Sequence, residues 1–536
     1  MVITRKEFLK LGLVAGGAGL ALSSGASASS PGGRGKETIG NLLRSAVRLP
    51  RPFRVPLPVP AVLEPVRSDA DADHYEITQK VAKAEILPGL QTEVWGYEGS
   101  FPGPTIESRS GRATIVRQTN ELPVPVSTHL HGGRTPAASD GFPTDLILPR
   151  GRSSEEHSPH AHHGNPDRPL DNKAGWTFHR GSKEYFYPLE QRAATLWYHD
   201  HRMDFTGPQV YRGLAGFHII RDDEEDALPL PKDEKDVPLM ICDRSFGEHG
   251  SFLYPARDPS LQSKPGVKEN YMEGVLGDAI LVNGVPWPFM EVSNTRYRFR
   301  ILNASNARRY RLALDPELSD GAPFVQVGSD GGLLGAPIPH RTITIAQAER
   351  FDVVVDFSKY PGGTKITLTN HLGDGTTSRV MRFHGFRKEK EESTVPKRLS
   401  DMGAFEALSE PGARLTRKFS FTRGAPNGQV VWAINGEVFD PSRISARPKL
   451  GSTEIWEFVT DLHHPVHLHL VHFKVLSRNG RRPLPKDAGW KDTVDVLPGQ
   501  VVRVISRFDG YRGKYVFHCH NLEHEDMMMM SNFGVV

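Results

Sequence analysis

Cysteine is scarce in this chain of 536 residues, which contains only Cys242 and Cys519. Two cysteines cannot build the disulfide framework of many exported proteins, so the fold must depend on hydrophobic cores. An excess of either charge is missing as well, because 66 Lys and Arg residues face 63 Asp and Glu residues. This balance excludes the basic footprint of a nucleic-acid-binding protein.

Apolar runs long enough to span a bilayer are also missing. The apolar stretch at residues 11–22 is too short, so we expect no membrane span. It follows Arg5 and Lys6 and precedes a small-residue cleavage motif, which predicts an export signal at residues 1–28. Residues 4–10 resemble a twin-arginine signal with Lys6 in place of the second arginine. We therefore expect a periplasmic, cell-surface or secreted protein that follows this route, with the general secretory route as the alternative.

Turn residues are abundant, with 52 Gly and 42 Pro, and they separate short apolar runs. This pattern predicts an all-β protein with few long helices. A turn followed by a strand-like run occurs three times, which indicates three β-sandwich domains. The three copies are residues 101–104 with 113–120, 282–284 with 297–303, and 434–436 with 453–460.

Domain boundaries are expected where hydrophobic alternation gives way to charged and polar residues. Residues 29–59 are predicted to be a flexible lead-in, because the prolines between residues 52 and 60 are too dense for a paired strand. The three domains are then placed at residues 60–222, 230–386 and 412–536.

Histidines are placed in pairs. A chain with 23 histidines should contain about one His-x-His pair by chance, yet five are present. Four lie in apolar or aromatic surroundings: His129 and His131, His199 and His201, His467 and His469, His518 and His520. The fifth lies in a histidine-rich segment at residues 150–173, which is either a copper-capturing loop or a solvated insertion.

On a β-strand, residues i and i+2 point to the same face, so each pair presents two imidazoles together. A lone histidine is more often a hydrogen-bonded core residue than a metal ligand. Four such pairs make that interpretation improbable, and eight imidazoles could converge on one metal centre.

Strand parity separates Cys519 from its neighbours, because it must point away from the face that His518 and His520 share. Cys519 should therefore bind a different metal ion. By the same rule His464 lies on the opposite face from His467 and can join Cys519, provided that Pro465 does not interrupt the strand.

Downstream of Cys519, His524 and the methionines at residues 527–530 complete a possible ligand set. Two imidazoles, one thiolate and a weak thioether are typical of a blue-copper electron-transfer site. This combination is a poor one for structural zinc. Cys242 has no such neighbours and is predicted to be a small buried hydrophobe.

The motifs at residues 196–201, 302–305 and 518–526 resemble those of the multicopper oxidases. The likeness is to the three-domain laccase-like group, which includes bacterial spore-coat laccase, phenoxazinone synthase and bilirubin oxidase. It implies three cupredoxin-like Greek-key β-sandwich domains and four copper ions. It assigns type 1 copper to His464, Cys519, His524 and axial Met529; type 2 copper to His129 and His467; and the type 3 pair to His131, His199, His201, His469, His518 and His520.

Reduction of dioxygen to water also consumes protons, and two carboxylates match positions of the family. Glu525 follows a copper ligand directly, and Asp140 lies nine residues after His131. Both are candidates for proton relay. The alternatives are a ligand-orienting role for Glu525 and a turn-forming role for Asp140.

The resemblance implies a laccase-like oxidase of phenols or aminophenols, with dioxygen as the electron acceptor and electrons entering through the imidazole edge of His524. An axial methionine suggests a relatively low potential and easily oxidised substrates.

The alternative is a metallo-oxidase of Cu(I), Fe(II) or Mn(II), motivated by residues 527–530 and the histidine-rich segment. A third class, an electron carrier without an oxygen site, conflicts with the complete ligand set. A monomer is the family-based default.

Overall fold

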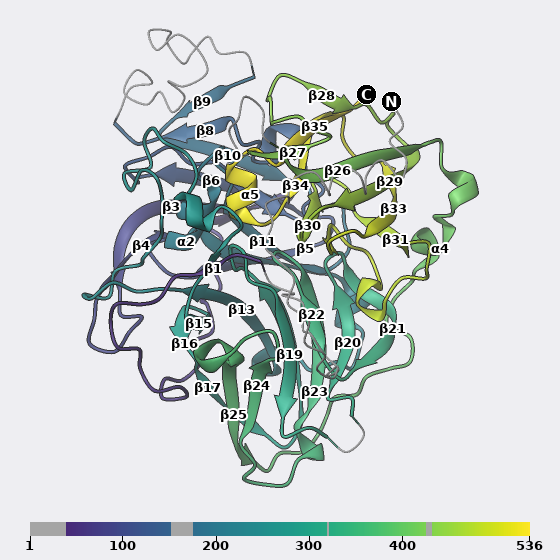
Figure 1. Cartoon of the computed structure of the whole chain (residues 1–536). Coiled ribbons are helices and arrows are strands. Elements are labelled where there is room, and N and C mark those ends of the chain that lie inside the picture. Colours follow the sequence, from purple (N-terminus) through teal and green to yellow (C-terminus); the bar gives the residue numbers. More distant parts are fainter. Residues whose placement is uncertain (1–38, 152–174, 319–320, 425–430) are drawn as a thin grey trace, which may run out of the picture. The chain divides into compact units, whose positions relative to one another are not determined.

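The computed structural model describes residues 39–151, 175–318, 321–424 and 431–536. Figure 1 shows strands along this whole range and only short helices. The α-helices are α2 (Thr206–Arg212), α3 (Asp223–Asp226), α4 (Gly403–Ala407) and α5 (Leu522–Asp526). The 3₁₀ helices are η1 (Ala137–Ser139), η4 (Asp233–Lys235), η5 (Glu269–Tyr271), η6 (Phe357–Lys359), η7 (Gly375–Ser378), η8 (Glu410–Gly412) and η10 (Pro485–Asp487). The all-β prediction is confirmed.

The first pair of sheets is built from residues 67–221. One sheet has the order β10-β6-β3-β2, with β4 also paired to β3, and the other has the order β5-β12-β11-β7. Their strands are β2 (Arg67–Ser68), β3 (Ala72–Ala84), β4 (Thr92–Tyr97), β5 (Gly103–Arg109), β6 (Ala113–Asn120), β7 (Thr128–His131), β10 (Ser182–Tyr187), β11 (Ala194–Asp200) and β12 (Ala215–Arg221). A two-stranded sheet beside them contains β8 (Asp145–Leu148) and β9 (Thr177–Arg180).

The middle pair of sheets is built from residues 236–387, with the orders β16-β15-β13-β18-β23-β20-β21 and β17-β25-β24-β19-β22. The strands of the first order are β13 (Asp236–Arg244), β15 (Ala279–Val282), β16 (Val285–Pro286), β18 (Arg296–Asn303), β20 (Phe324–Ser329), β21 (Gly332–His340) and β23 (Arg350–Asp356). Those of the second are β17 (Phe289–Ser293), β19 (Tyr310–Asp315), β22 (Ile343–Ile345), β24 (Ile366–Asn370) and β25 (Arg379–Arg387).

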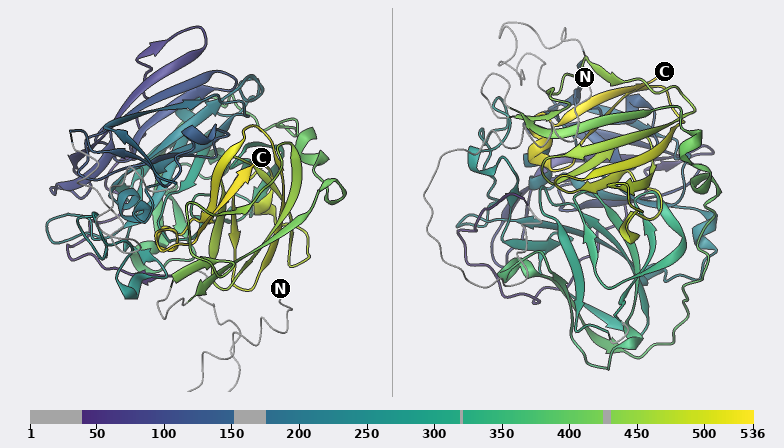
Figure 2. Two further views of the ribbon diagram at one scale, coloured as in Figure 1. Left: turned by 90° about the horizontal axis from the view of Figure 1, so that it is seen from above. Right: turned by 45° about the vertical axis from the view of Figure 1, so that its right-hand side comes forward.

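The third pair of sheets is built from residues 416–535, with the orders β27-β26-β29-β33-β31 and β28-β35-β34-β30-β32. These are the green and yellow strands that lie together in Figure 2. The first sheet contains β26 (Thr416–Gly424), β27 (Val431–Ile434), β29 (Ser452–Thr460), β31 (Phe473–Arg478) and β33 (Val501–Phe508). The second contains β28 (Ile444–Ala446), β30 (His464–Leu468), β32 (Thr493–Val496), β34 (Gly513–Cys519) and β35 (Met530–Val535).

Alternating burial explains why each pair of sheets packs as a sandwich. In β6, every second residue is buried, which is the pattern of a strand with one face in a core. In the third pair, Phe458 and Val504 of one sheet share a hydrophobic core with Val466 and Phe517 of the other. The two sheets of this third pair therefore enclose an apolar layer between them.

The predicted turn repeats coincide with turns before strands. Asn283 and Gly284 have φ values of 49° and 87° and join β15 to β16, which is the conformation that an Asn-Gly hairpin needs. The strand-like runs of the three repeats form β6, β18 and β29. The domain boundaries remain predictions; strands stop at Arg221 and at Arg387 and resume at Asp236 and at Thr416.

The expectation of a flexible lead-in over residues 29–59 is wrong for residues 39–59. Asn41–Leu42 forms β1, which pairs in parallel with β14 (Val275–Leu276). Further along, the backbone N–H groups of Phe53 and Leu57 donate to the carbonyls of Trp287 and Phe289. Proline removes only its own N–H group, so the residues between prolines still form these bonds. Residues 1–38, and with them the predicted export signal, lie outside the described residues.

Candidate metal centre

Four neighbouring strand segments bring the histidine pairs together. In the first pair of sheets, β7 and β11 are antiparallel, and His199 lies opposite His129 while Trp197 lies opposite His131. In the third pair, β30 and β34 are antiparallel, and His467 lies opposite His518. The strand register therefore aligns two histidine pairs within each of these sheets.

The eight paired imidazoles converge into groups whose ring nitrogens lie within 4.8 Å of one another. Nε2 of His518 lies 3.3 Å from Nε2 of His201 and 3.2 Å from Nε2 of His469. Nε2 of His129 and Nε2 of His467 are 3.4 Å apart. The first group contains His131, His199 and His520, and the second contains His201, His469 and His518. The third contains His129 and His467, and His131 lies close to both of these residues. Both the first and the third pair of sheets contribute to this centre.

A second group lies on the other face of β34, as strand parity predicts. Nδ1 of His464 lies 3.3 Å and Nδ1 of His524 lies 3.6 Å from Sγ of Cys519. The two Nδ1 atoms are 3.1 Å apart. Pro465 does not interrupt β30, so His464 keeps the parity that turns it towards Cys519.

Met529 is fully buried in the same hydrophobic core as Cys519. Its carbonyl accepts a hydrogen bond from the backbone N–H of Cys519 at 3.1 Å. Its own N–H donates to the carbonyl of His524 at 3.0 Å. The backbone of Met529 is therefore tied to two residues of the sulfur-containing group.

Hydrogen bonds from Nδ1 fix the orientation of several imidazoles. Nδ1 of His129 donates to the carbonyl of Asp140 at 2.5 Å, and Nδ1 of His199 donates to the carbonyl of Asp200 at 2.8 Å. Nδ1 of His467 donates to the carbonyl of Asp492 at 2.9 Å. Each bond places the N–H on Nδ1 and leaves the lone pair of Nε2 free to face the centre.

The chemistry of these side chains fits metal ions. Within the described residues, the buried ring nitrogens without a hydrogen-bond partner include Nδ1 of His131, Nε2 of His199, Nδ1 of His201 and both nitrogens of His520. Buried polar atoms are rarely left unpaired, so these nitrogens call for a ligand. Burial lowers the pKa of His131 and His201, which favours the neutral imidazoles that metal binding requires.

Burial shifts the pKa of the Cys519 thiol upwards, whereas it shifts those of the imidazoles downwards. Burial raises its pKa well above the ordinary value, so without a cation it would stay protonated. A soft cation beside the sulfur would reverse this preference, because thiolate coordination releases the proton. Cys242 is also buried, in β13, but lies within an apolar core, as predicted.

Both candidate carboxylates lie at the histidine centre. Oδ2 of Asp140 accepts a hydrogen bond from Nδ1 of His469 at 2.8 Å, and burial raises the pKa of Asp140 well above its ordinary value. Oε2 of Glu525 lies 3.1 Å from Nδ1 of His518. Burial raises the pKa of Glu525, but the imidazoles of His518 and His201 outweigh it and lower the pKa to about 2.

The imidazole of His524, through which electrons are expected to enter, is fully buried. The indole of Trp432 lies against its ring, with centroids 3.8 Å apart. Its Nε2 lies 3.3 Å from Nδ2 of Asn521, which donates to the carbonyl of Glu273 at 3.1 Å. A substrate therefore meets a covering layer before it reaches the imidazole.

Sequence reasoning missed the residues that support the ligands. Asp461 accepts a hydrogen bond from Nε2 of His464 at 3.1 Å, and Asp492 contacts both His131 and His467. An acidic residue three positions before His464 was a weak signal for the first. No local pattern distinguishes Asp492, because it lies far from both histidines in the sequence.

A histidine-rich segment and a charged cavity are the remaining features. The histidine-rich segment at residues 150–173 lies almost entirely outside the described residues. A cavity of about 360 Å³, lined by Glu107, Arg221 and Lys232 among others, is charged but contains none of the clustered histidines. Several of its charges pair with one another, as Arg221 does with Glu107 at 2.9 Å.

Comparisons with known proteins agree with this geometry. Family models described as multicopper oxidase match residues 78–157, 176–225 and 410–536. The chain is 36% identical to a laccase of Bacillus subtilis (strain 168), over 88% of this chain and 96% of that protein. It is 35% identical to a bilirubin oxidase of Albifimbria verrucaria, over 90% and 81% of the two chains. The crystal structure of a laccase from Pediococcus acidilactici superimposes with a TM-score of 0.76 at 31% identity, covering 92% and 96%.

Proposed function

Because this chain belongs to the multicopper oxidase family, we propose that its clustered side chains bind the four copper ions of that family as the sequence motifs indicate. The enzyme is a laccase-like oxidoreductase with oxygen as electron acceptor. The proposed type 1 ligands are His464, Cys519, His524 and Met529, and the proposed type 2 ligands are His129 and His467. The proposed type 3 ligands are His131, His199, His201, His469, His518 and His520.

The convergence of eight imidazoles beside a separate Cys-His₂ group is the observation that carries this proposal. When bound, copper supplies the one-electron redox chemistry that couples oxidation of a substrate to reduction of dioxygen to water. The protein joins the two groups covalently, because Cys519 lies between His518 and His520 in the chain. This is the shortest covalent path that a strand can offer between groups on its opposite faces.

Proton supply is the proposed task of Glu525 and Asp140. Each carboxylate is buried and lies within 3.1 Å of an imidazole of the histidine centre. A buried carboxylate at that distance can exchange protons with groups in the centre, provided that it is not fully engaged as a structural acceptor. The same contacts also support an orienting role, which the Glu525 substitution described below separates from proton relay.

The reducing substrate is proposed to be a phenol or an aminophenol. The named relatives include laccases and a bilirubin oxidase, whose names indicate oxidation of organic molecules. Trp432 and the carbonyl of Glu273 separate His524 from such a substrate, so the electron must cross this layer without direct contact. Outer-sphere transfer of this kind tolerates substrates of different shape.

Oxidation of Cu(I), Fe(II) or Mn(II) is less well supported. Three of the four methionines that motivated this alternative are at most 9% exposed: Met527, Met529 and Met530. Their side chains pack in hydrophobic clusters, where they fill space. They therefore do not form an exposed thioether surface for metal substrates.

Export and a monomeric state complete the proposal. Among the described helices, none is long and apolar enough to span a membrane. The export signal proposed for residues 1–28 would be removed, and N-terminal sequencing of the protein from the periplasm or medium tests this. Light scattering of the purified enzyme tests the monomer.

The decisive experiment combines spectroscopy with oxygen uptake. We expect the purified enzyme to bind four copper ions per chain, to show the intense absorption band that gives a type 1 site its blue colour, and to show type 1 and type 2 EPR signals. Oxygen uptake should be fast with an aminophenol or a simple phenol and slow with Cu(I) or Fe(II). Uptake with metal ions alone would replace the proposed substrate class, and a colourless copper-loaded enzyme would contradict the Cys519 assignment.

A further inference from the structure

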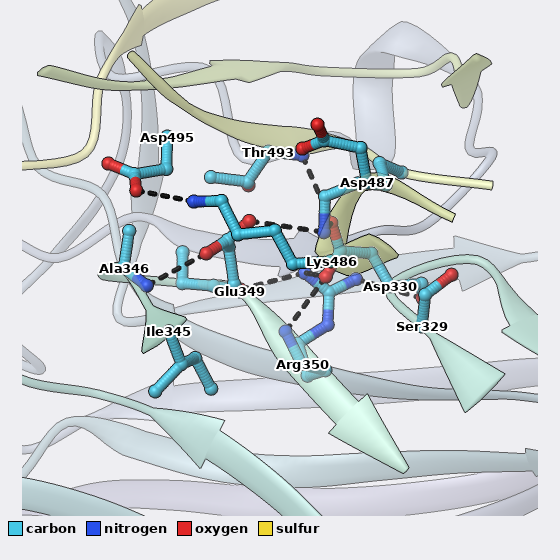
Figure 3. Close-up of polar contacts among 12 residues, drawn as sticks. Ser329, Asp330, Ile345, Ala346, Glu349, Arg350, Lys486, Asp487, Thr493 and Asp495 are labelled. Carbon is cyan, nitrogen blue, oxygen red and sulfur yellow. Dashed lines mark hydrogen bonds and ion pairs between the residues drawn. The ribbon is translucent and has the colours of Figure 1, made fainter. Parts of the chain in front are cut away.

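A buried cluster of charged side chains connects the middle pair of sheets to the segment that precedes β32. Asp330, Glu349 and Arg350 belong to the middle pair, and Lys491 and Asp492 precede β32. Each of these five side chains is at most 1% exposed. Figure 3 shows Asp330 and Arg350 beside Thr493, whose backbone N–H donates to Oδ2 of Asp330 at 3.3 Å.

The guanidinium of Arg350 is held at several points. Its Nη1 donates to Oδ1 of Asp492 at 2.8 Å, and its Nη2 pairs with Oδ2 of the same carboxylate. Nε donates to the carbonyl of Thr195 in β11 at 2.9 Å. The remaining donors reach the carbonyls of Ala348 at 2.8 Å and Asp330 at 3.0 Å. Lysine could not reproduce this planar set of contacts.

Asp492, held in this way by Arg350, accepts hydrogen bonds from two imidazoles. Nε2 of His131 donates to Oδ1 of Asp492 at 3.0 Å, and Nδ1 of His467 donates to its backbone carbonyl at 2.9 Å. The hydroxyl of Thr493 donates to the same Oδ1 at 2.9 Å. These bonds leave lone pairs on Nδ1 of His131 and on Nε2 of His467, and the latter faces His129 at 3.4 Å.

The cluster also sets the local charge. Two cations, Arg350 and Lys491, face three carboxylates, Asp330, Glu349 and Asp492, which leaves one net negative charge (2 − 3 = −1). A negative charge against His131 and His467 favours a cation at their free nitrogens.

We propose that Arg350 is a positioning residue for the histidine centre, which acts by holding Asp492 so that His131 and His467 present the correct nitrogens to copper. The middle pair of sheets supplies none of the proposed ligands, and this contact gives it a role in copper binding. The proposal rests on the ligand roles proposed above for His131 and His467.

Arg350→Lys tests this role in the copper-loaded enzyme. The variant keeps the charge but loses the two-point contact with Asp492, so we expect type 2 copper to be bound about 10–100-fold more weakly. The measurement is the loss of the type 2 EPR signal to a chelator over time. The blue absorption should persist, because the hydrogen bonds of Arg350 go to Thr195, Ala348, Asp330 and Asp492, none of which belongs to the group around Cys519.

Arg308→Lys is the matched control. Arg308 is 4% exposed, and its Nε donates to Asp243 at 2.8 Å while its Nη2 donates to the carbonyl of Gly277 at 2.7 Å, all within the middle pair of sheets. This variant loses a comparable buried contact, but the hydrogen-bond partners of Arg308 are not bonded to any of the clustered histidines. It should release type 2 copper at the wild-type rate.

Asp492→Asn and Thr493→Val change the same support from the other side, so the test does not depend on the folding of a single variant. Each should speed the loss of type 2 copper. The double variant Arg350→Lys with Asp492→Asn should lose type 2 copper no faster than the faster of the two single variants, because both changes break the same contact. Wild-type rates in Arg350→Lys and Asp492→Asn would overturn the positioning role alone. A wild-type enzyme without a type 2 signal would instead overturn the ligand assignment beneath it.

Discussion

At the scale of single residues, Cys519 and Cys242 offer a matched pair, since both are buried cysteines in β-strands. Cys519→Ser should abolish the blue absorption and essentially all oxygen uptake, because serine cannot provide the soft thiolate of a type 1 site. The type 2 EPR signal should remain, since the eight paired imidazoles are untouched. Absorption and EPR spectra of the copper-loaded variant measure both effects.

Cys242→Ala is the control for that substitution. Its side chain packs among apolar residues and lies outside the metal-binding groups of the described residues. It should keep the blue absorption and lose only about 1 kcal/mol of stability, as small core truncations do. A blue band that survives in Cys519→Ser would contradict the proposed type 1 site.

Glu525 is the residue at which proton relay and ligand orientation can be separated. Glu525→Gln keeps the shape and a hydrogen-bonding oxygen near His518 but removes the carboxylate that can take up and release a proton. If the residue relays protons, oxygen uptake should slow by about 10²–10⁴-fold with four coppers and the blue absorption retained. Lost type 2 or type 3 copper, with slow uptake only in proportion to that loss, would indicate an orienting role instead. Asp140→Asn is expected to behave in the same way.

At the scale of elements, the turn after η1 tests how tightly the backbone supports His129. Gly141 has a φ of 74°, and a Cβ there would lie 2.1 Å from the carbonyl oxygen of Thr128. Gly141→Ala should therefore displace the Asp140 carbonyl that orients His129. We expect a loss of more than about 2 kcal/mol in stability and a reduced type 2 copper content.

Gly451→Ala separates the backbone strain from the clash. Gly451 has a similar φ of 79°, but no atom would lie within 4 Å of its Cβ. It should cost only the about 1–2 kcal/mol of a left-handed alanine, with full copper content. Equal denaturation midpoints and copper contents in both variants would show that the contact with Thr128 is unimportant. Chemical denaturation and metal analysis provide these values.

Elements also show which local predictions could be made from the sequence. The i, i+2 rule placed the members of each histidine pair on one strand face and Cys519 on the other, because this geometry depends only on neighbouring residues. Residues 39–59 were misjudged for a related reason. Their proline content is local, whereas the carbonyls of Trp287 and Phe289 that accept their hydrogen bonds are distant in the sequence.

At the scale of the whole molecule, a buried ion cluster links α3, β13 and β18. Oδ1 of Asp236 accepts a hydrogen bond from Nε of Arg300 at 2.8 Å, and Oε2 of Glu225 accepts one from Nη2 of Arg298 at 3.0 Å. Burial raises the pKa of both carboxyls, but Arg300 and Arg298 outweigh it and lower both pKa values. The folded state therefore holds these groups ionised more strongly than the unfolded chain does.

Acid should consequently destabilise the protein through this cluster. A depressed carboxyl pKa contributes stability above the unfolded pKa, near 4, and loses it as pH falls towards the lower folded value. We expect the free energy of unfolding to fall steeply below about pH 4. Asp236→Asn should lower the free energy of unfolding by about 3–5 kcal/mol at neutral pH. It should also make the fall of this free energy below about pH 4 less steep. Denaturation curves of both proteins across this range measure the slopes, and an unchanged slope would exclude the cluster as the cause.

The sequence by itself determined which side chains are chemically suited to hold copper and how each histidine pair faces, since residue type and strand parity are local properties. Only the tertiary structure decided which imidazoles share a group, that Trp432 covers His524, and that Arg350 reaches the centre through Asp492. These contacts join residues from separate pairs of sheets. Their geometry follows from how the sheets pack and which strands lie side by side, and no local pattern records that packing.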